Sequence, residues 1–349
     1  MMQAIDWNLQ VARWTDELGY DEFWMGEHLC EPWEPIPAPD LFIAQAIGQT
    51  SRIKLGPAGH CLPFHHPVAL AYRVAQLDHM AQGRYQFGIA SGSIPTDLAM
   101  YGIDPKVGQH RKMLGESLEI ILRIWASEPG DAWLFEGNYW TVNFTAPEGP
   151  HGHPHIRPFQ KPHPPIAVTG MTPSSGTLRI AGARGFIPMS MNMAPHFVAT
   201  HWEAIEEGAR EAGRTPRRSD WRILKQILIA DTDKEARRLA IEGPMGRMMR
   251  DYTLPQFHKM GLLRLFKTDP DMADSELTVE WFVDNAWLVG SPETVLEKVQ
   301  ETYDVLGGFG YLMALGYHFA DMPEVWNNSL SALANEVIPK LAYLTPDDI

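Results

Sequence analysis

Hydrophobic residues along the chain follow two alternating patterns. Trp7, Val11, Trp14 and Leu18 recur at helical spacing before Gly19, so we expect an amphipathic first helix that ends at the glycine. Later helices are expected near residues 41–49, 70–81, 114–125, 175–184 and 195–212. Short apolar runs separate them and are interpreted as strands: "YDEFWMG", "RIKLGPA", "RYQFGIA", "PIAVTG", "GFIPMSM", "WRILKQILIA" and "GFGYLMALGY".

This alternation predicts a parallel sheet covered by helices. Repeated units without a central break favour a closed (β/α)8 TIM barrel, whose sites lie at the carboxyl ends of the strands. The expected strand ends fall near residues 26, 58, 90, 170, 190, 230 and 316. These are about seven strands, because the sequence begins inside the first helix; the first barrel strand either lies upstream or is missing. Neither G-x-G-x-x-G nor G-x-x-x-x-G-K-[ST] occurs, which disfavours an open nucleotide-binding sheet.

We expect residues 1–349 to form one domain. Two stretches of this domain interrupt the alternation of strands and helices. Residues 127–164 form an insertion after the fourth helix, with a possible hairpin in "WLFEGNYWTV". Residues 231–282 are a mostly helical excursion, which we interpret as a lid. The regular pattern resumes afterwards, where Ser291 and Pro292 suit the N-cap and first position of a helix.

Composition narrows the function. The formal charge of −14 argues against nucleic acid and anionic membranes as partners, because both require a basic surface. No apolar run approaches the roughly 20 residues of a membrane span, and the first residues lack the apolar core of a signal peptide. Only two cysteines occur, Cys30 and Cys61, so we expect a reducing, cytoplasmic environment.

Polar residues at the predicted strand ends are the candidates for chemistry. Glu27 and His28 follow one strand, and Gly170 ends another before a Ser/Thr/Pro loop and a helix. Backbone N–H groups at such a helix start suit a phosphate, although a plain helix cap is the alternative. His60, His65 and His66 suggest a metal, but prolines interrupt them and the spacing does not match a zinc site. We therefore predict no metal.

Several motifs together resemble a known family. "WMGEH", "LDHMAQGRYQFG", "VTGMTPSSGTLRIAGARG" and "LVGSPETVLEKV" resemble the bacterial luciferase-like flavin monooxygenases. "EPWEPIPAPDLFIA" and "DTDKEARRLAIEGPMGRM" are most similar to the diketocamphane monooxygenases within that family, which are FMN-dependent type II Baeyer–Villiger enzymes. The resemblance extends from about residue 4 to about residue 340.

The resemblance implies roles for individual residues. His28 matches a catalytic histidine near C4a of the flavin, and Ala58-Gly59 matches a non-prolyl cis peptide against the flavin ring. Ser91 stands where luciferase has an arginine that reaches the phosphate, so Arg179 or Arg184 is expected to help the helix end instead. Residues assigned to FMN are Ala58, Gly59, Ser91, Thr169, Gly170, Met171, Thr172, Ser174, Ser175 and Thr177. The substrate pocket is expected to include Glu27, Trp33, His60 and Met191.

The implied reaction uses FMNH2 and O2 to oxygenate a small apolar, cyclic ketone through a flavin C4a peroxide. Three alternatives stay open: oxidation of an aldehyde, alkene or heteroatom on the same fold, F420-dependent hydride transfer, and a metal-dependent barrel hydrolase. A separate reductase is expected to supply the reduced FMN. A homodimer is also expected, with Trp7, Leu41, Phe42 and Tyr72 as candidate surface residues.

Overall fold

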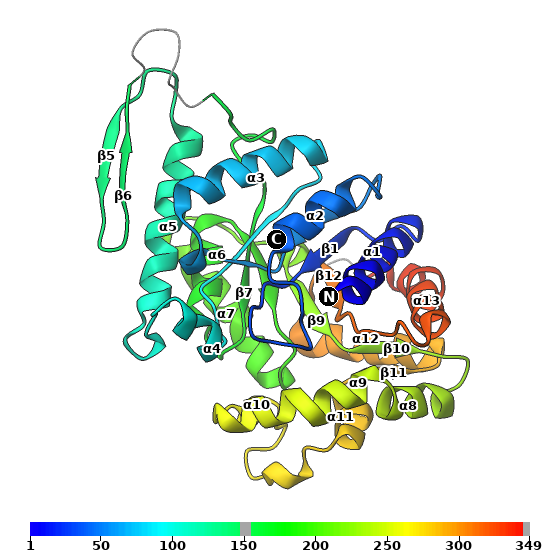
Figure 1. Cartoon of the computed structure of the whole chain (residues 1–349). Coiled ribbons are helices and arrows are strands. Elements are labelled where there is room, and N and C mark those ends of the chain that lie inside the picture. Colours follow the sequence, from blue (N-terminus) through cyan, green and yellow to red (C-terminus); the bar gives the residue numbers. More distant parts are fainter. Residues whose placement is uncertain (147–154, 345–349) are drawn as a thin grey trace. The chain divides into compact units, whose positions relative to one another are not determined.

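The computed structural model describes residues 1–146 and 155–344 (Figure 1). The described chain divides into two compact units. The first contains Met1 and residues 21–167, and the second contains residues 2–20 and those from 168 onward. In both units strands alternate with helices, as the sequence pattern predicts.

The first unit contains two pairs of parallel strands. They include the strands predicted to end near residues 26, 58 and 90. β1 (Glu22–Met25) pairs with β2 (Lys54–Pro57), and the short β3 (His60–Cys61) pairs with β4 (Phe87–Ala90). Apolar residues of the strands, such as Leu55 and Phe87, are completely buried. The helices of this unit are α2 (Pro39–Ile47), α3 (Pro67–Ala81), α4 (Pro95–Met100) and α5 (Gln109–Ala126).

The insertion forms the predicted hairpin. β5 (Trp133–Glu136) pairs antiparallel with β6 (Thr141–Phe144), and the rings of Trp133 and Phe144 stack at 4.8 Å. On α5, the Glu116 carboxylate accepts hydrogen bonds from the backbone N–H groups of residues 138, 139 and 140. This carboxylate therefore ties the hairpin turn to α5. Figure 1 shows the hairpin beside this helix. Residues 147–154 of the predicted insertion lie outside the described residues.

The second unit contains α1 (Met2–Glu17) and most of β7 (Ile166–Gly170). Strands β12 (Tyr311–Ala314), β9 (Arg222–Lys225), β8 (Ile187–Ser190) and β7 neighbour one another in that order, and β12, β9 and β8 run parallel. β10 (Ile227–Ile229) continues β9 after a break and pairs in parallel with β11 (Leu288–Gly290). The helices that alternate with these strands are α6 (Gly176–Arg184), α7 (Pro195–Glu211), α12 (Pro292–Leu306) and α13 (Pro323–Ala332).

The predicted excursion is helical. Its helices are α8 (Asp233–Glu242), α9 (Pro244–Met248), α10 (Leu254–Lys259) and α11 (Val279–Asn285). A π-helical turn joins α9 to α10, and Arg237 on α8 forms an ion pair with Asp284 on α11 at 2.8 Å. The role of this segment as a lid stays a prediction.

Local signals in the sequence correspond to observed helix ends and strand ends. The Ser291 hydroxyl accepts the Thr294 N–H at the start of α12, with Pro292 in the first turn, as expected for an N-cap. The observed strands end at residues 25, 57, 90, 170, 190, 229 and 314, within two residues of the predicted positions. The sequence reasoning missed β3, α4 and β11, and the one strand predicted in "WRILKQILIA" is divided into β9 and β10. Among the described residues, no helix is long and apolar enough to cross a membrane.

Candidate active site

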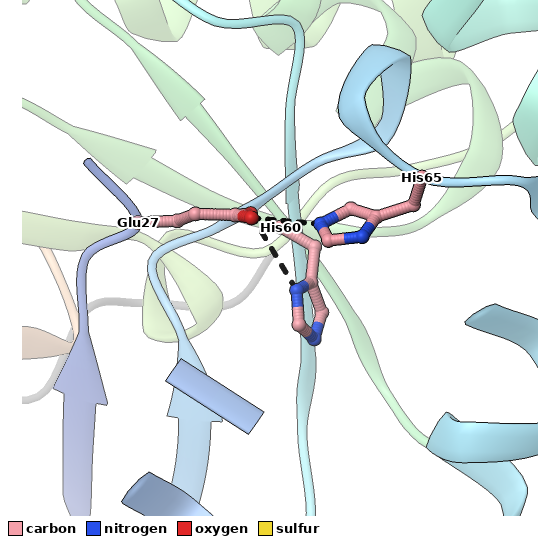
Figure 2. Close-up of side chains that lie close together, drawn as sticks. All are labelled: Glu27, His60 and His65. Carbon is pink, nitrogen blue, oxygen red and sulfur yellow. Dashed lines mark hydrogen bonds and ion pairs between the residues drawn. The ribbon is translucent and has the colours of Figure 1, made fainter. Parts of the chain in front are cut away.

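In the first unit, a buried glutamate follows β1. Glu27 is 4% exposed, and its carboxylate accepts hydrogen bonds from the Cys61 backbone N–H and from Nε2 of His65, each at 2.7 Å. Figure 2 shows this carboxylate directed toward the imidazoles of both His60 and His65. Glu27 therefore connects the end of β1 to β3 and to the loop that follows it.

The ionisation of Glu27 depends on these neighbours. Burial by itself would raise the pKa of the carboxyl group, but the imidazoles of His60 and His65 outweigh it and lower the pKa to about 2. Nδ1 of His60 is 3.6 Å from Oε2 of Glu27, which is longer than an ordinary hydrogen bond, whereas Nε2 of His65 is 2.7 Å from Oε1. Glu27 is therefore a carboxylate at neutral pH.

His60 is completely buried beside this carboxylate. Burial lowers its pKa and outweighs the opposing effect of Glu27, so the ring is neutral at pH 7. Its Nδ1 has no hydrogen-bond partner among the described residues. Ligand atoms of Glu27, His60 and His65 lie within 4.8 Å of one another, so their spacing alone is compatible with a metal ion.

His28, the predicted catalytic residue, is held among carboxylates. Its Nε2 lies 3.1 Å from Oε2 of Glu34, and its Nδ1 lies 3.6 Å from Oδ2 of Asp97. Burial would lower the pKa of His28, but the hydrogen bond to Glu34 and the negative charges of Glu34, Asp97 and Glu31 raise it overall. The imidazolium form is therefore favoured, and the ring can hold a proton at Nε2.

Asp97 was missed by the sequence reasoning. This buried residue in the first turn of α4 accepts the backbone N–H groups of Leu29 at 3.3 Å and Cys30 at 2.8 Å. It therefore fixes the chain that directly follows His28. A carboxylate inside the stretch "SIPTDLAM" offers no sequence signal for this role, because its partners lie more than sixty residues earlier.

The small residues between β2 and β3 contact the neighbouring strand. The Ala58–Gly59 peptide bond is cis, as the family resemblance predicts. A Cβ atom placed on Gly59 would lie 2.6 Å from the Ile89 nitrogen, and one on Gly56 would lie 2.8 Å from the Gln86 carbonyl oxygen. The backbone preceding and within β4 is therefore one physical reason why these positions lack side chains.

Two further residues of this unit were predicted to belong to the site, and both are more exposed to solvent than Glu27. Trp33 is 38% exposed in the proline-rich loop after His28. Ser91 directly follows β4 and is half-buried. Their assignments to substrate and FMN stay predictions.

In the second unit, the predicted phosphate loop connects β7 to α6. Ser174 has a left-handed backbone with φ of 51°, and its N–H donates to Oγ1 of Thr200 at 2.9 Å. Thr177 donates its hydroxyl proton to the Thr169 carbonyl at 2.7 Å. Ser175, 2.9 Å from that hydroxyl, must then donate to it. The hydroxyl protons of Ser175 and Thr177 are therefore both donated to acceptors within the protein.

The start of α6 nevertheless suits an anion. Gly176 is its first residue, and a Cβ atom built there would meet nothing within 4 Å. The first N–H groups of a helix lack intrahelical acceptors and carry partial positive charge, so the backbone rather than the hydroxyls fits a phosphate here. Arg179, one of the two arginines expected to help bind the phosphate, forms an ion pair with Glu211.

A buried histidine also supports this loop. His201 on α7 is completely buried, with Nδ1 2.9 Å from the Ser190 hydroxyl and Nε2 3.0 Å from the Thr172 carbonyl. Because the carbonyl can only accept, Nε2 carries the proton and Ser190 donates to Nδ1. Ser190 in turn accepts from the Trp221 indole at 2.8 Å. The sequence reasoning did not identify this network.

The remaining predicted residues of the second unit continue along the same strand ends. The Met191 N–H donates to the Gly170 carbonyl at 2.9 Å, directly after β8. Met171 and Thr172 follow β7, and Met171 and Met191 are both half-buried. The structure thus brings Gly170 and Met191 together, while the role of Met191 in a substrate pocket stays a prediction.

Comparisons with known proteins agree with this arrangement. A family model for luciferase-like monooxygenases matches residues 2–308. The chain is 36% identical to 3,6-diketocamphane 1,6-monooxygenase of Pseudomonas putida, over 97% of this chain and 93% of that protein. It is 29% identical to limonene 1,2-monooxygenase of Rhodococcus erythropolis, over 96% of this chain and 81% of that protein.

A solved structure is also similar over nearly the whole chain. The oxygenating constituent of 3,6-diketocamphane monooxygenase from Pseudomonas putida, a type II Baeyer–Villiger monooxygenase in complex with FMN, gives a TM-score of 0.90 at 36% identity. The match covers 97% of this chain and 94% of that one. The fold is therefore the luciferase-like TIM barrel, as predicted from the sequence.

The chain belongs to the luciferase-like monooxygenase family. It is accordingly a flavin-dependent monooxygenase, an oxidoreductase, which confirms the class that the motifs predicted.

Proposed function

We propose that this protein uses FMNH2 and O2 to convert a small apolar cyclic ketone into a lactone. The observation that carries the proposal is the position of His28, at the end of β1 with Nε2 3.1 Å from the Glu34 carboxylate. An imidazole of raised pKa can hold a proton for the oxygen chemistry and return it. The 36% identity to a diketocamphane monooxygenase over nearly the full chain supports the ketone as substrate class.

When bound, reduced FMN supplies the two electrons with which O2 is activated. One oxygen atom enters the C–C bond beside the carbonyl carbon, and the other leaves as water. In this proposal His28 retains or transfers the proton at Nε2, and Asp97 holds the backbone after His28 in place. Gly56 and Gly59, which have no side chains, let the chain before His60 lie close to the neighbouring backbone.

The FMN phosphate is proposed to bind the N-terminus of α6. The open space above Gly176 and the first backbone N–H groups of that helix support this assignment. The network of His201, Ser190 and Thr172 would keep the loop in one conformation. Free reduced FMN is proposed to come from a separate reductase, because a similar protein is described as an oxygenating constituent.

A homodimer is also proposed, with a revised set of surface residues. Trp7 and Phe42 are buried at 6% and 4% exposure, and the Trp7 indole donates to the Tyr317 carbonyl. These two residues belong to the interior, which corrects the sequence prediction. Leu41 is 72% exposed and stays a candidate contact. Light scattering at micromolar concentration should give twice the chain mass; the mass of one chain would contradict the proposal.

The proposed activity can be tested with chemically reduced FMN, isotopically labelled O2 and a panel of cyclic ketones. Lactones that carry one labelled oxygen are expected, and treatment with a chelator should not change their yield. If the same assay converts only alkenes, the alternative suggested by similarity to limonene 1,2-monooxygenase is correct. Hydrolysis that depends on a metal and needs no flavin would contradict both.

A further inference from the structure

His65 lies between an anion and a cation. Its Nε2 is 2.7 Å from Oε1 of Glu27, and its Nδ1 is 3.0 Å from Nη2 of Arg73 on α3. Nε of Arg73 is in turn 3.2 Å from Oδ2 of Asp40, a buried residue in the first turn of α2. A continuous chain of contacts thus extends from the buried end of β1 to two helices.

The chemistry of arginine determines the tautomer of His65. A guanidinium group carries five N–H donors and no acceptor, and it does not lose its charge in proteins. Nδ1 of His65 must therefore accept from Arg73 and carry no proton. The neutral ring then has its proton on Nε2, where it donates to the Glu27 carboxylate.

We propose that Arg73 locks His65 in the Nε2–H tautomer, so that Glu27, His65 and Arg73 act as positioning residues for the adjacent His28. Glu27 also accepts the Cys61 N–H, and the three side chains together hold the end of β1 against β3. The effect on catalysis rests on the proposed function, whereas the tautomer does not.

The same geometry decides what the cluster of Glu27, His60 and His65 can bind. Metal coordination by His65 through Nε2 requires an unprotonated Nε2 and therefore moves the ring proton to Nδ1. That proton would face the N–H of Arg73 at the position where the two nitrogens are 3.0 Å apart. Arg73 therefore excludes a metal from this cluster, although the spacing of the ligand atoms would permit one.

The titratable groups that face His65 are all compatible with a proton on Nε2. The facing groups are the Glu27 carboxylate, the Arg73 guanidinium and the imidazole of His60, whose ring centre is 5.3 Å away. His60 is neutral because it is buried, and Asp40 acts only through Arg73. Removing Arg73 would take away the donor that faces Nδ1, and with it the requirement that this nitrogen carry no proton.

The first test is nitrogen NMR of the full chain labelled at histidine, with His65 assigned from the spectrum of His65→Gln. At neutral pH the nitrogen shifts of wild-type His65 should be those of a ring that carries its proton on Nε2 and accepts a hydrogen bond at Nδ1. In Arg73→Met the Nδ1 signal should shift because this nitrogen loses its donor, and Arg73→Lys should restore the wild-type pattern. Arg111→Met, on the exposed side of α5, is the matched control and should leave the His65 signals unchanged.

Zinc provides a second readout on the same samples. Stoichiometric Zn²⁺ should leave the His65 signals of the wild type unmoved and shift them in Arg73→Met. A wild-type His65 that carries its proton on Nδ1, or that responds to Zn²⁺, would overturn the proposal.

The third readout is product formed per FMNH2 oxidised, which should fall about tenfold in Arg73→Met because of misplacement near the reacting atoms. Unchanged coupling would overturn the positioning role of the three residues and leave the tautomer intact. Absence of ketone oxidation in every variant, the wild type included, would instead contradict the proposed function.

Discussion

Nε2 of His28 lies 3.1 Å from Oε2 of Glu34, and the two side chains are 20% and 40% exposed. The pair is thus partly shielded from water but still open enough for proton exchange. Because the carboxylate favours the imidazolium, Glu34 contributes to the raised pKa of His28. This relationship connects the predicted catalytic residue to a loop residue to which the sequence analysis assigned no role.

Replacing His28 with alanine should uncouple oxygen consumption from product formation. One lost proton-transfer group typically costs about 10²–10⁴ in rate, so FMNH2 should be oxidised while the oxygen appears as hydrogen peroxide. Binding of FMN should change little. The measurement is product formed per FMNH2 oxidised, with the reductant in excess. Equal coupling in His28→Ala and wild type would show that the imidazole is only structural.

Replacing Glu34 with glutamine should shift the pH dependence of the reaction. The variant keeps the size of the side chain and removes the charge that favours the imidazolium, so the pKa of His28 should fall toward its ordinary value. The His28-dependent limb of the rate profile should move to lower pH, and the partial exposure of Glu34 limits the size of this shift. A profile that does not move, or that moves upward, would exclude this electrostatic coupling.

Placing a carboxylate at Gly176 should weaken FMN binding. A Cβ atom at this position meets nothing within 4 Å, and a carboxylate favours the helix start, so Gly176→Asp should fold normally. If the phosphate binds above α6, the added negative charge should raise the Kd for FMN at least about tenfold. Gly176→Asn is the neutral control of the same size. Equal affinities of the two variants in fluorescence titrations would place the phosphate elsewhere.

The buried Lys225 should make stability depend on pH. It is 6% exposed, and burial lowers its pKa from 10.5 to about 8. Between these values the unfolded chain binds the proton and the native chain does not, so stability should rise with pH from about 8 to about 10.5. At pH 7 nearly the whole penalty applies, and Lys225→Met should raise the free energy of unfolding by about 3 kcal/mol.

Urea unfolding at several pH values checks this. The gain in Lys225→Met should diminish as pH approaches 10.5. Lys234→Met, at an exposed position of α8, should change stability by less than about 0.5 kcal/mol. A destabilised Lys225→Met would mean that the amine has a favourable partner.

The sequence by itself determined the order and type of most elements. Strand ends near residues 26, 90 and 170 and the helix start at Ser291 were predicted because periodicity and capping involve residues that are close along the chain. The hairpin of β5 and β6 was predicted for the same reason, because its two strands are close along the chain. The motifs also indicated the family, and the comparisons confirmed it.

Only the tertiary structure decided which side chains meet. The partners of His28 and Glu27 include Asp97 and Cys61, which lie 69 and 34 residues away along the chain. Burial likewise distinguished the apolar residues of the helices: Trp7 and Phe42 are in the interior, while Leu41 is exposed. Gly59 is small because the backbone of β4 passes close to it. Contacts of this kind depend on distance in space, which hydrophobic periodicity along a chain does not encode.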